Sequence, residues 1–447
     1  MSTSLAGTNT FLSGGGTSDA YLEAFEALSS AAPLPERFAS LRREGLEQFG
    51  ALGFPTTKNE DWHFTSVSRI AEQPFTLVPS GSGAVTQEQI ERFGFGEASR
   101  AWHTFVFVNG RFAPELSTIG TLPAGVQVRD LASAWSDAPE LLEGLGDLAS
   151  SATHSFTAMN TAFLHDGAVI SVADDIKVEQ PIHLVFVVDA TAAKTMIHPR
   201  TLIRLGTGAE ANVIESFVAT SDAMAFTNAV AEAFVGDGAT LRHYKIQREG
   251  QRAFHVGTTE VTQGRDSHYV SFSFATGGAL SRTNVYARLD GPGCGVTLNG
   301  LYLLDGEQHC DHQTLVVHAQ PNCFSRELYK GILDGRSHGV FNGKVYVHPI
   351  AQQTDGKQTS KTLLLSETAH IDTKPQLEIF ADDVKCTHGA TVGQIDQQAL
   401  FYMKSRGVGA EDARRLLTYA FAADALETIE IDAVREGLER MTLDRYL

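Results

Sequence analysis

The stretch GVTLNGLYLLDGEQHCDHQTLVVHAQPNCFSRELYKGILDGRSHGVFNGKVYVH, residues 295–348, decides the fold class. Apolar and polar residues alternate with a period of two in short segments, and Asp305-Gly306 and Asp334-Gly335 supply turn signals between them. This pattern predicts short β-strands. The intervals between the segments leave no room for crossover helices, so a doubly wound α/β fold is disfavoured.

The same β pattern extends from about Phe156 to Ile395. Three all-β architectures fit it: a sandwich, a propeller and a β-solenoid. A sandwich is disfavoured by size, because single all-β domains reach roughly 200–250 residues at most. The turns recur mostly at intervals of roughly 20–30 residues, the scale of solenoid coils, and no propeller blade signature is present. The pattern alone therefore favours a solenoid and leaves the other two open.

Both flanks of the β region differ from it in character. Residues 1–18 are dense in Gly, Ser and Thr and are expected to be disordered. Residues 19–150 form a helical and mixed region, with apolar residues three and four apart over Asp19–Gly53 and a strand that ends in an Asn109-Gly110 turn. Residues 396–447 contain three amphipathic helical patterns, the first closed by Gly407. The expected organisation is thus a tail, an N-terminal region, a β core over 151–395 and a C-terminal helical region.

Composition limits the kinds of partner. The 447 residues carry a formal net charge of −18, which repels nucleic-acid phosphates and anionic lipid surfaces. We expect no nucleic-acid partner and no membrane partner. The N-terminal residues lack the pattern of a signal peptide, and the four cysteines contain no Cys-x-x-Cys pair. These features predict a cytoplasmic protein without a disulfide framework or a self-contained four-cysteine zinc site.

The common enzymatic motifs are missing from the sequence. There is no Walker A loop, so ATP-driven work would need a nucleotide site on another chain. Residues 335–339 match the Gly-x-Ser-x-Gly pattern, but a strand pattern follows the serine where a nucleophile elbow needs a helix. We therefore expect a glycine-rich turn there.

Histidines and cysteines gather in the second half of the chain, and imidazole and thiolate are ligands of soft and borderline metals. On a strand, residues two apart share a face, so Cys310 could converge with His312 and Cys386 with His388. Structural packing remains the favoured alternative for the dense cluster, because free cysteine is often a small buried apolar residue. That cluster is His309, Cys310, Asp311, His312, His318 and Cys323.

A long ordered set of motifs relates the chain to a known family. YKGI, FNGKVYV, AQQTD, LLLS, KPQLEIFADDVKCTHGATVG and LFYMKSRG follow one another within Arg326–Val408. This order closely resembles the C-terminal half of SufB/SufD-family proteins of iron–sulfur cluster assembly. HCDHQTLVVH fits the same family, and KNEDWHFTSV, residues 58–67, resembles the N-terminal signature of its SufD branch. Gly389 stands where SufB-type chains carry a glutamate, which also favours the SufD branch.

The resemblance implies a right-handed parallel β-helix between two helical regions. It implies a non-enzymatic scaffold subunit that works with SufB and with the ATPase SufC. It also implies that His388, with a weaker role for Cys386, helps to assemble or ligate a transient iron–sulfur cluster shared with SufB at the SufB interface. No cofactor is then expected in the isolated chain. SufC is expected to dock on the C-terminal helices, with these candidate residues: Arg414, Leu416, Leu417, Tyr419 and Phe421.

Two other functions stay open at this point. The chain could be a structural subunit that only stabilises SufB, or a stand-alone β-solenoid metalloprotein that uses the cluster from His309 to Cys323. A free solenoid edge invites pairing with another strand, so we expect a homodimer when the chain is isolated.

Overall fold

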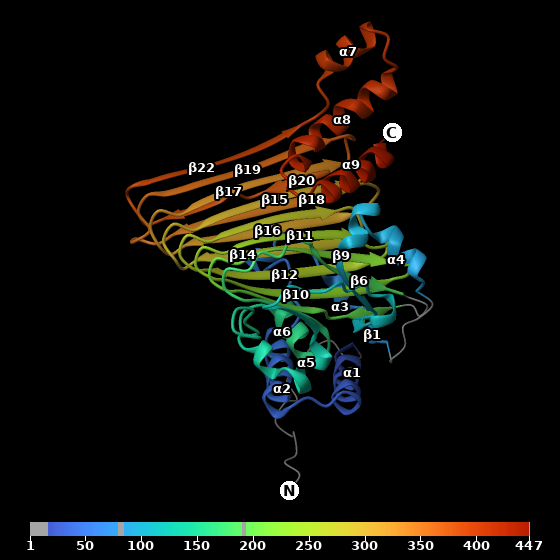
Figure 1. Cartoon of the computed structure of the whole chain (residues 1–447). Coiled ribbons are helices and arrows are strands. Elements are labelled where there is room, and N and C mark those ends of the chain that lie inside the picture. The colour runs from blue at the N-terminus through green and yellow to red at the C-terminus, as the bar shows by residue number, and fades with distance from the viewer. Residues whose placement is uncertain (1–16, 79–84, 190–193, 447) are drawn as a thin grey trace.

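The computed structural model describes residues 17–78, 85–189 and 194–446. A parallel β-solenoid of about seven turns forms the body, with helices at its two ends (Figure 1). The predicted fold class, a β-helix flanked by helical regions, is confirmed. The expected disordered tail lies outside the described residues up to residue 16, and α1 begins at Thr17.

The N-terminal region is built mainly of short elements. Two predicted features are confirmed there: helices over residues 19–53, and a turn at Asn109 and Gly110, where both residues have positive φ (50° and 77°) and join β2 to β3 as a hairpin. The elements are α1 (Thr17–Ala31), α2 (Glu36–Leu52), η1 (Glu60–Trp62), α3 (Ser68–Ala71), β1 (Thr76–Leu77), α4 (Gln87–Phe93), η2 (Glu97–Ala101), β2 (His103–Val108), β3 (Arg111–Phe112), η3 (Pro114–Leu116), β4 (Val126–Asp130), α5 (Leu131–Asp137), η4 (Pro139–Leu142) and α6 (Ser155–Ala162).

In the described parts of the solenoid, the strands follow one another without a helix between them. They are β5 (Gly167–Val172), β6 (Ile182–Val188), β7 (Thr195–Ile197), β8 (Arg200–Leu205), β9 (Glu210–Ala219), β10 (Ala225–Val235), β11 (Thr240–Arg248), β12 (Phe254–Gln263), β13 (His268–Ala275), β14 (Leu280–Leu289), β15 (Gly295–Leu304), β16 (His309–His318), β17 (Phe324–Leu333), β18 (His338–Val347), β19 (Thr354–Leu364), β20 (His370–Thr373), β21 (Gln376–Ile379) and β22 (Val384–Gly393).

From β8 to β20, successive strands alternate between two sheets. Within the described residues, a 12-stranded sheet runs β20-β18-β16-β14-β12-β10-β8-β5-β4 along its main path, and a 10-stranded sheet runs β22-β19-β17-β15-β13-β11-β9-β6-β2-β3. Pairing between coils is parallel and in register, so that Leu280, His309, His338 and His370 stack in one row. Each coil therefore covers the backbone edge of the coil before it.

Helices cover part of the outside of the solenoid. The predicted three C-terminal helices are α7 (Gln397–Ser405), α8 (Ala410–Leu426) and α9 (Asp432–Tyr446). From α8 and α9, Leu426 and Leu438 pack with Tyr244 and Ile246 on the outer face of the 10-stranded sheet. The predicted domain limits at 150/151 and 395/396 stay predictions; the nearest elements begin at Ser155 and Gln397. No helix in the described ranges is long and apolar enough to cross a bilayer.

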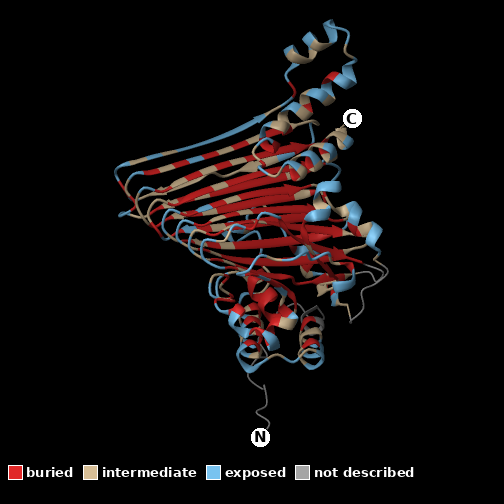
Figure 2. Cartoon of the chain, viewed as in Figure 1, coloured by how far each residue is buried: buried red, intermediate tan, exposed pale blue. Residues whose placement is uncertain are grey.

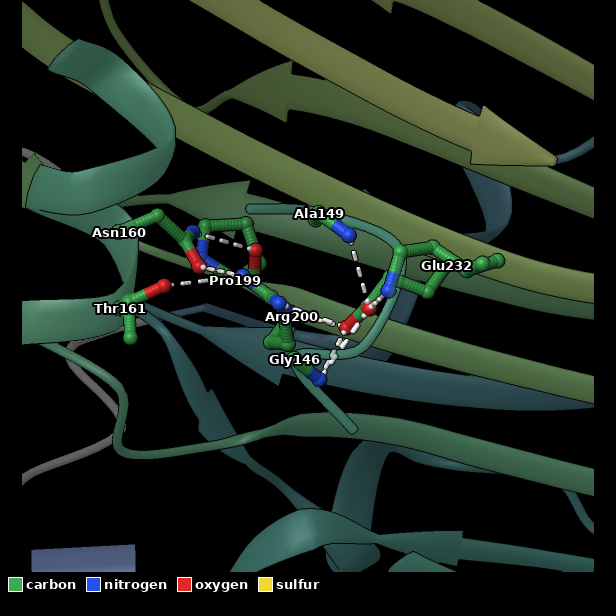
Figure 3. Close-up of polar contacts among 8 residues, drawn as sticks. Gly146, Ala149, Asn160, Thr161, Pro199, Arg200 and Glu232 are labelled. Atoms are coloured by element: carbon green, nitrogen blue, oxygen red, sulfur yellow. Dashed lines mark hydrogen bonds and ion pairs between the residues drawn. The ribbon is translucent and has the colours of Figure 1, made fainter. Parts of the chain in front are cut away.

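A buried ion pair ties the N-terminal region to the first coils (Figure 3). Arg200 Nη2 lies 2.6 Å from Glu232 Oε1, with side-chain exposures of 1% and 0%. The Glu232 carboxylate also accepts backbone N–H bonds from the loop before α6, from Gly146 (2.9 Å) and Ala149 (3.0 Å) among others. Arg200 Nη1 donates to Asn160 Oδ1 on α6 at 3.1 Å. Because each of these polar groups has a partner, their interactions offset the free-energy cost of removing them from water. They also fix the position of the loop before α6.

We predict that Glu232→Ala lowers the free energy of unfolding by about 3–5 kcal/mol, because it leaves the buried Arg200 charge and several N–H groups without partners. Urea unfolding followed by circular dichroism measures the change. Glu210→Ala is the matched control: its carboxylate pairs with Lys177 on the surface, and such pairs contribute about 1 kcal/mol or less. Equal losses for the two variants would contradict the structural role of the cluster.

Candidate functional site at the open end of the solenoid

The last strand, β22, forms the open end of the solenoid. It pairs with β19 along one edge, and the 10-stranded sheet ends there within the described ranges. Most residues from Lys385 to Val392 are exposed, unlike those of every neighbouring strand (Figure 2). An edge strand presents unpaired backbone N–H and C=O groups and can pair with another chain.

Cys386 and His388 lie on the same side of β22. In the ladder with β19, Cys386 is opposite Gly356 and His388 is opposite Gln358. Gln358 is 2% exposed and points into the solenoid, so its partners in register also face the interior side. No further coil covers that side, and His388 is therefore exposed. Alternation along the strand thus brings together the two residues that the sequence pairs.

The two residues differ in their suitability as metal ligands. Cys386 is half-buried and packs beside the cluster of Val345, Val347 and Ala351. Burial raises the pKa of its thiol above the ordinary value, which keeps it protonated near neutral pH and weakens it as a ligand. His388 offers an imidazole nitrogen on an exposed side chain, and imidazole is the commonest metal ligand in proteins.

Open space and apolar side chains surround this edge. A Cβ added at Gly389 would meet no atom within 4 Å. Val392, near the C-terminal end of β22, is 49% exposed, and Ile350 and Phe380, on the turns that lead into β19 and β22, are 63% and 57% exposed. Single exposed apolar side chains are common on protein surfaces, so the uncovered strand edge itself is the stronger sign of an interaction surface.

Polar groups line the interior directly beneath the edge. Gln358 Oε1, Ser360 Oγ and Thr362 Oγ1 are buried without a hydrogen-bond partner among the described atoms. Further in, Glu327 accepts a 2.6 Å hydrogen bond from Thr314 Oγ1, and burial raises the pKa of Glu327 to about 7. The last coils are therefore more polar inside than a closed apolar core.

A second polar group lies deeper in the solenoid. Burial lowers the pKa of Lys245 to about 8, an effect that the nearby Glu215 and Glu249 carboxylates oppose. Glu215 is hydrogen-bonded to His243 at 3.0 Å, and Glu249 to His255 at 2.8 Å. The two carboxylates are hydrogen-bonded to histidines, and their charges act favourably on Lys245, which offsets part of the cost of burying these groups.

The cluster predicted around residues 309–323 is divided by strand alternation. Cys310 and His312 share the interior face, with 3.7 Å between Sγ and Nδ1. His309 and Asp311 face outward, where both contact Thr65 Oγ1 of the N-terminal region, at 2.9 and 2.6 Å. No three of the predicted ligands bring their ligand atoms together in the described part of the chain. Residues 335–337 lie in the turn between β17 and β18, and residues 338–339 begin β18, so that a strand follows Ser337, as expected.

The predicted docking residues on the C-terminal helices differ in how far they are exposed. Leu417 and Phe421 pack against the body, and Lys330 Nζ donates to the Phe421 carbonyl at 2.8 Å. Tyr419 is half-buried, whereas Arg414 and Leu416 are exposed.

The structure adds two candidates that helical periodicity missed. α7 has no buried residue and projects beyond the body (Figure 1), leaving Phe401 74% and Tyr402 59% exposed. Two adjacent aromatic residues lie on different sides of a helix, so their spacing does not predict which side is buried. Both are exposed here because α7 lies away from the solenoid.

We predict that the isolated chain is a dimer in solution, because β22 leaves a long strand edge uncovered. Light scattering after size-exclusion chromatography measures the mass. Val392→Lys should shift the chain to monomer, since an edge charge opposes strand pairing. Leu52→Lys is the matched control, because Leu52 is 41% exposed at the end of α2, far from β22 (Figure 1). A monomeric wild-type chain would contradict this prediction.

Comparison with known proteins gives a consistent assignment along the chain. The family described as SUF system FeS cluster assembly, SufBD core domain, matches residues 186–421, and the SufBD protein N-terminal region matches residues 18–184. The iron-sulfur cluster assembly protein SufD of Escherichia coli is 34% identical over 90% of this chain and 91% of its own length. An iron-sulfur cluster assembly SufBD family protein of Synechocystis is 31% identical over 89% of each chain. Protein ABCI7, chloroplastic, of Arabidopsis thaliana is 31% identical over 91% of this chain and 85% of its own length.

Proposed function

The chain belongs to the SufBD family of SUF-system iron–sulfur cluster assembly proteins, and we propose that it is a scaffold subunit that acts with SufB and the ATPase SufC to build and transfer nascent clusters. The observation that carries the proposal is the exposed edge strand β22, which presents His388 on the uncovered interior side of the last coil. The charge of −18 supports a complex of proteins rather than one with nucleic acid or membrane, and the proposed compartment is the cytoplasm.

His388 and Cys386 cannot hold a cluster alone, because such clusters are bound by four ligands, mostly thiolates. The remaining ligands therefore come from SufB in this proposal. A second solenoid that pairs its own edge with β22 would bring its residues opposite His388, since parallel and antiparallel pairing both place facing residues about 5 Å apart. An imidazole among thiolates reduces the negative charge of the site and raises its reduction potential.

The energy for release comes from SufC in this proposal. Arg414 and Leu416 on α8 and the exposed pair Phe401 and Tyr402 on α7 offer a surface for it. α8 is also bonded to the solenoid: Lys330 of β17, 4% exposed, lies 2.5 Å from Asp424 Oδ2. β17 pairs with β19 and β19 with β22. Nucleotide-driven closure of SufC subunits on these helices would thus strain the β22 interface.

The direct test is co-purification of the chain with its cognate SufB and SufC, as wild type and as His388→Ala, followed by anaerobic cluster reconstitution. We expect His388→Ala to leave the complex intact and to lose most of the cluster absorbance. The exposed position of His388 limits the cost in folding stability to about 0.5 kcal/mol, so the loss would be chemical.

His63→Ala is the control, because His63 is also exposed but belongs to the N-terminal region. A normal cluster in the His388→Ala complex would instead support the alternative that the chain only stabilises SufB. Turnover by the isolated chain, without either partner, would instead favour a stand-alone metalloprotein.

SufC docking has its own test. We expect the double variant Phe401→Ala and Tyr402→Ala to retain SufB but to reduce SufC recovery at least tenfold, because the two rings supply the largest exposed apolar surface of α7. Quantified pull-down measures the recovery. Removal of the residues after Gly407 should abolish it, and Leu52→Ala serves as the exposed apolar control. Unchanged recovery and unchanged ATPase stimulation after the truncation would place the docking surface elsewhere.

A further inference from the structure

Three side chains on the outer face of the 12-stranded sheet converge without a role in the proposed function. They are His338 at the start of β18, and His370 and Asp372 of β20. Their ligand atoms all lie within 4.8 Å of one another. His338 Nε2 is 2.8 Å from Asp372 Oδ2, and the His338 and His370 rings stack with centroids 3.9 Å apart.

The strand ladder explains this convergence. His338 pairs in register with His370, and Val340 pairs with Asp372. The two histidines are therefore direct neighbours across the ladder, while Asp372 lies two residues along the same face of β20. All three side chains are mounted on paired strands rather than on a loop, so their relative positions are held by the backbone hydrogen bonds of the sheet.

A third histidine supports the arrangement from the adjacent strand. The His309 ring packs edge-on against His338, with centroids 4.6 Å apart. Its Nε2 is bound to Thr65 Oγ1 at 2.9 Å, which holds it in place from the N-terminal region. His309 thereby closes one flank of His338, whereas the His338 and Asp372 side chains are 22% and 34% exposed and His370 is exposed. The group is walled on one side and open to solvent on the other.

We propose that His338, His370 and Asp372 form a binding site for a divalent first-row transition-metal ion such as iron(II) or zinc. Two imidazoles and one carboxylate are the ligand set that such ions accept, with open positions left for water. Ligand atoms that share one ion at about 2.0–2.2 Å lie roughly 3–4 Å apart, so small side-chain rotations complete the site. The ion would insert between His338 and Asp372 in place of their hydrogen bond.

This site is separate from the proposed cluster site and does not rest on the proposed function. His388 belongs to β22 of the other sheet. The resemblance to known proteins implies no cofactor in the isolated chain, so a resident or exchangeable ion here would be an additional property of the protein.

Cobalt(II) titration of the purified, metal-free full chain tests the proposal, because cobalt takes the same ligands and its d–d absorption reports their geometry. We expect one saturable equivalent per chain in the wild type. His370→Ala and Asp372→Asn should each weaken binding at least tenfold. Both positions are partly or fully exposed, so an unchanged thermal midpoint of the metal-free variants would verify that they fold.

Two further variants separate this site from other histidines. His348→Ala removes a half-buried imidazole from the turn after β18, and His388→Ala removes the one on β22; both should bind cobalt like the wild type. The proposal is overturned if the wild type binds no saturable equivalent or if His370→Ala and Asp372→Asn bind as tightly as the wild type. Loss of binding only in His388→Ala would also overturn it and assign the metal to the β22 site.

Discussion

In-register pairing of parallel strands between successive coils is the constraint on which the rest of this structure depends. Each coil satisfies the backbone groups of the one before it, as the ten-residue ladder between β16 and β18 illustrates. In such a solenoid no further coil covers the edge of the last one, which stays open unless another element caps it. Here that coil ends in β22, and the exposed side of the strand carries His388 and Cys386. The exposed strand edge is thus a consequence of the way in which the fold is propagated.

Alternation along each strand sorts chemically similar side chains into different environments. In β16 the interior receives Cys310 and His312, while His309 and Asp311 face outward to meet the N-terminal region. Near Lys245 in the interior, the Glu215 and Glu249 carboxylates are hydrogen-bonded to histidines, because a solenoid core offers little water to solvate buried charges. On the outer face, histidines stacked on neighbouring strands form a rigid row with one side open to solvent. Residues that are neighbours in the sequence of β16 therefore make two separate sets of contacts, one inside the solenoid and one on its outer face.

The C-terminal helices bind to the solenoid through some residues and expose others to solvent. α8 and α9 bury Leu426 and Leu438 on the solenoid, and Lys330 binds α8 through Asp424 and the Phe421 carbonyl. α7 has no buried residue, and Leu416 of α8 is exposed. An amphipathic stripe alone therefore does not show which apolar residues pack on the protein itself and which are available to a partner. Leu417 and Phe421 face the protein's own core, and the apolar side chains available to a partner are Leu416, Phe401 and Tyr402.

The sequence by itself determined the elements and the family. Period-two alternation predicted the strands, Asn109-Gly110 predicted a turn, and the ordered motifs after Arg326 identified the SufBD family and its β-helix. Only the tertiary structure decided which side chains meet. His338 and Asp372 lie in different coils, and no local period relates them. Likewise, β22 has the same kind of strand pattern as the buried strands and is exposed only because no coil follows it. The physical reason is that periodicity records which face a residue takes within one strand, whereas the lengths of the turns between coils set the register that brings residues of different strands together.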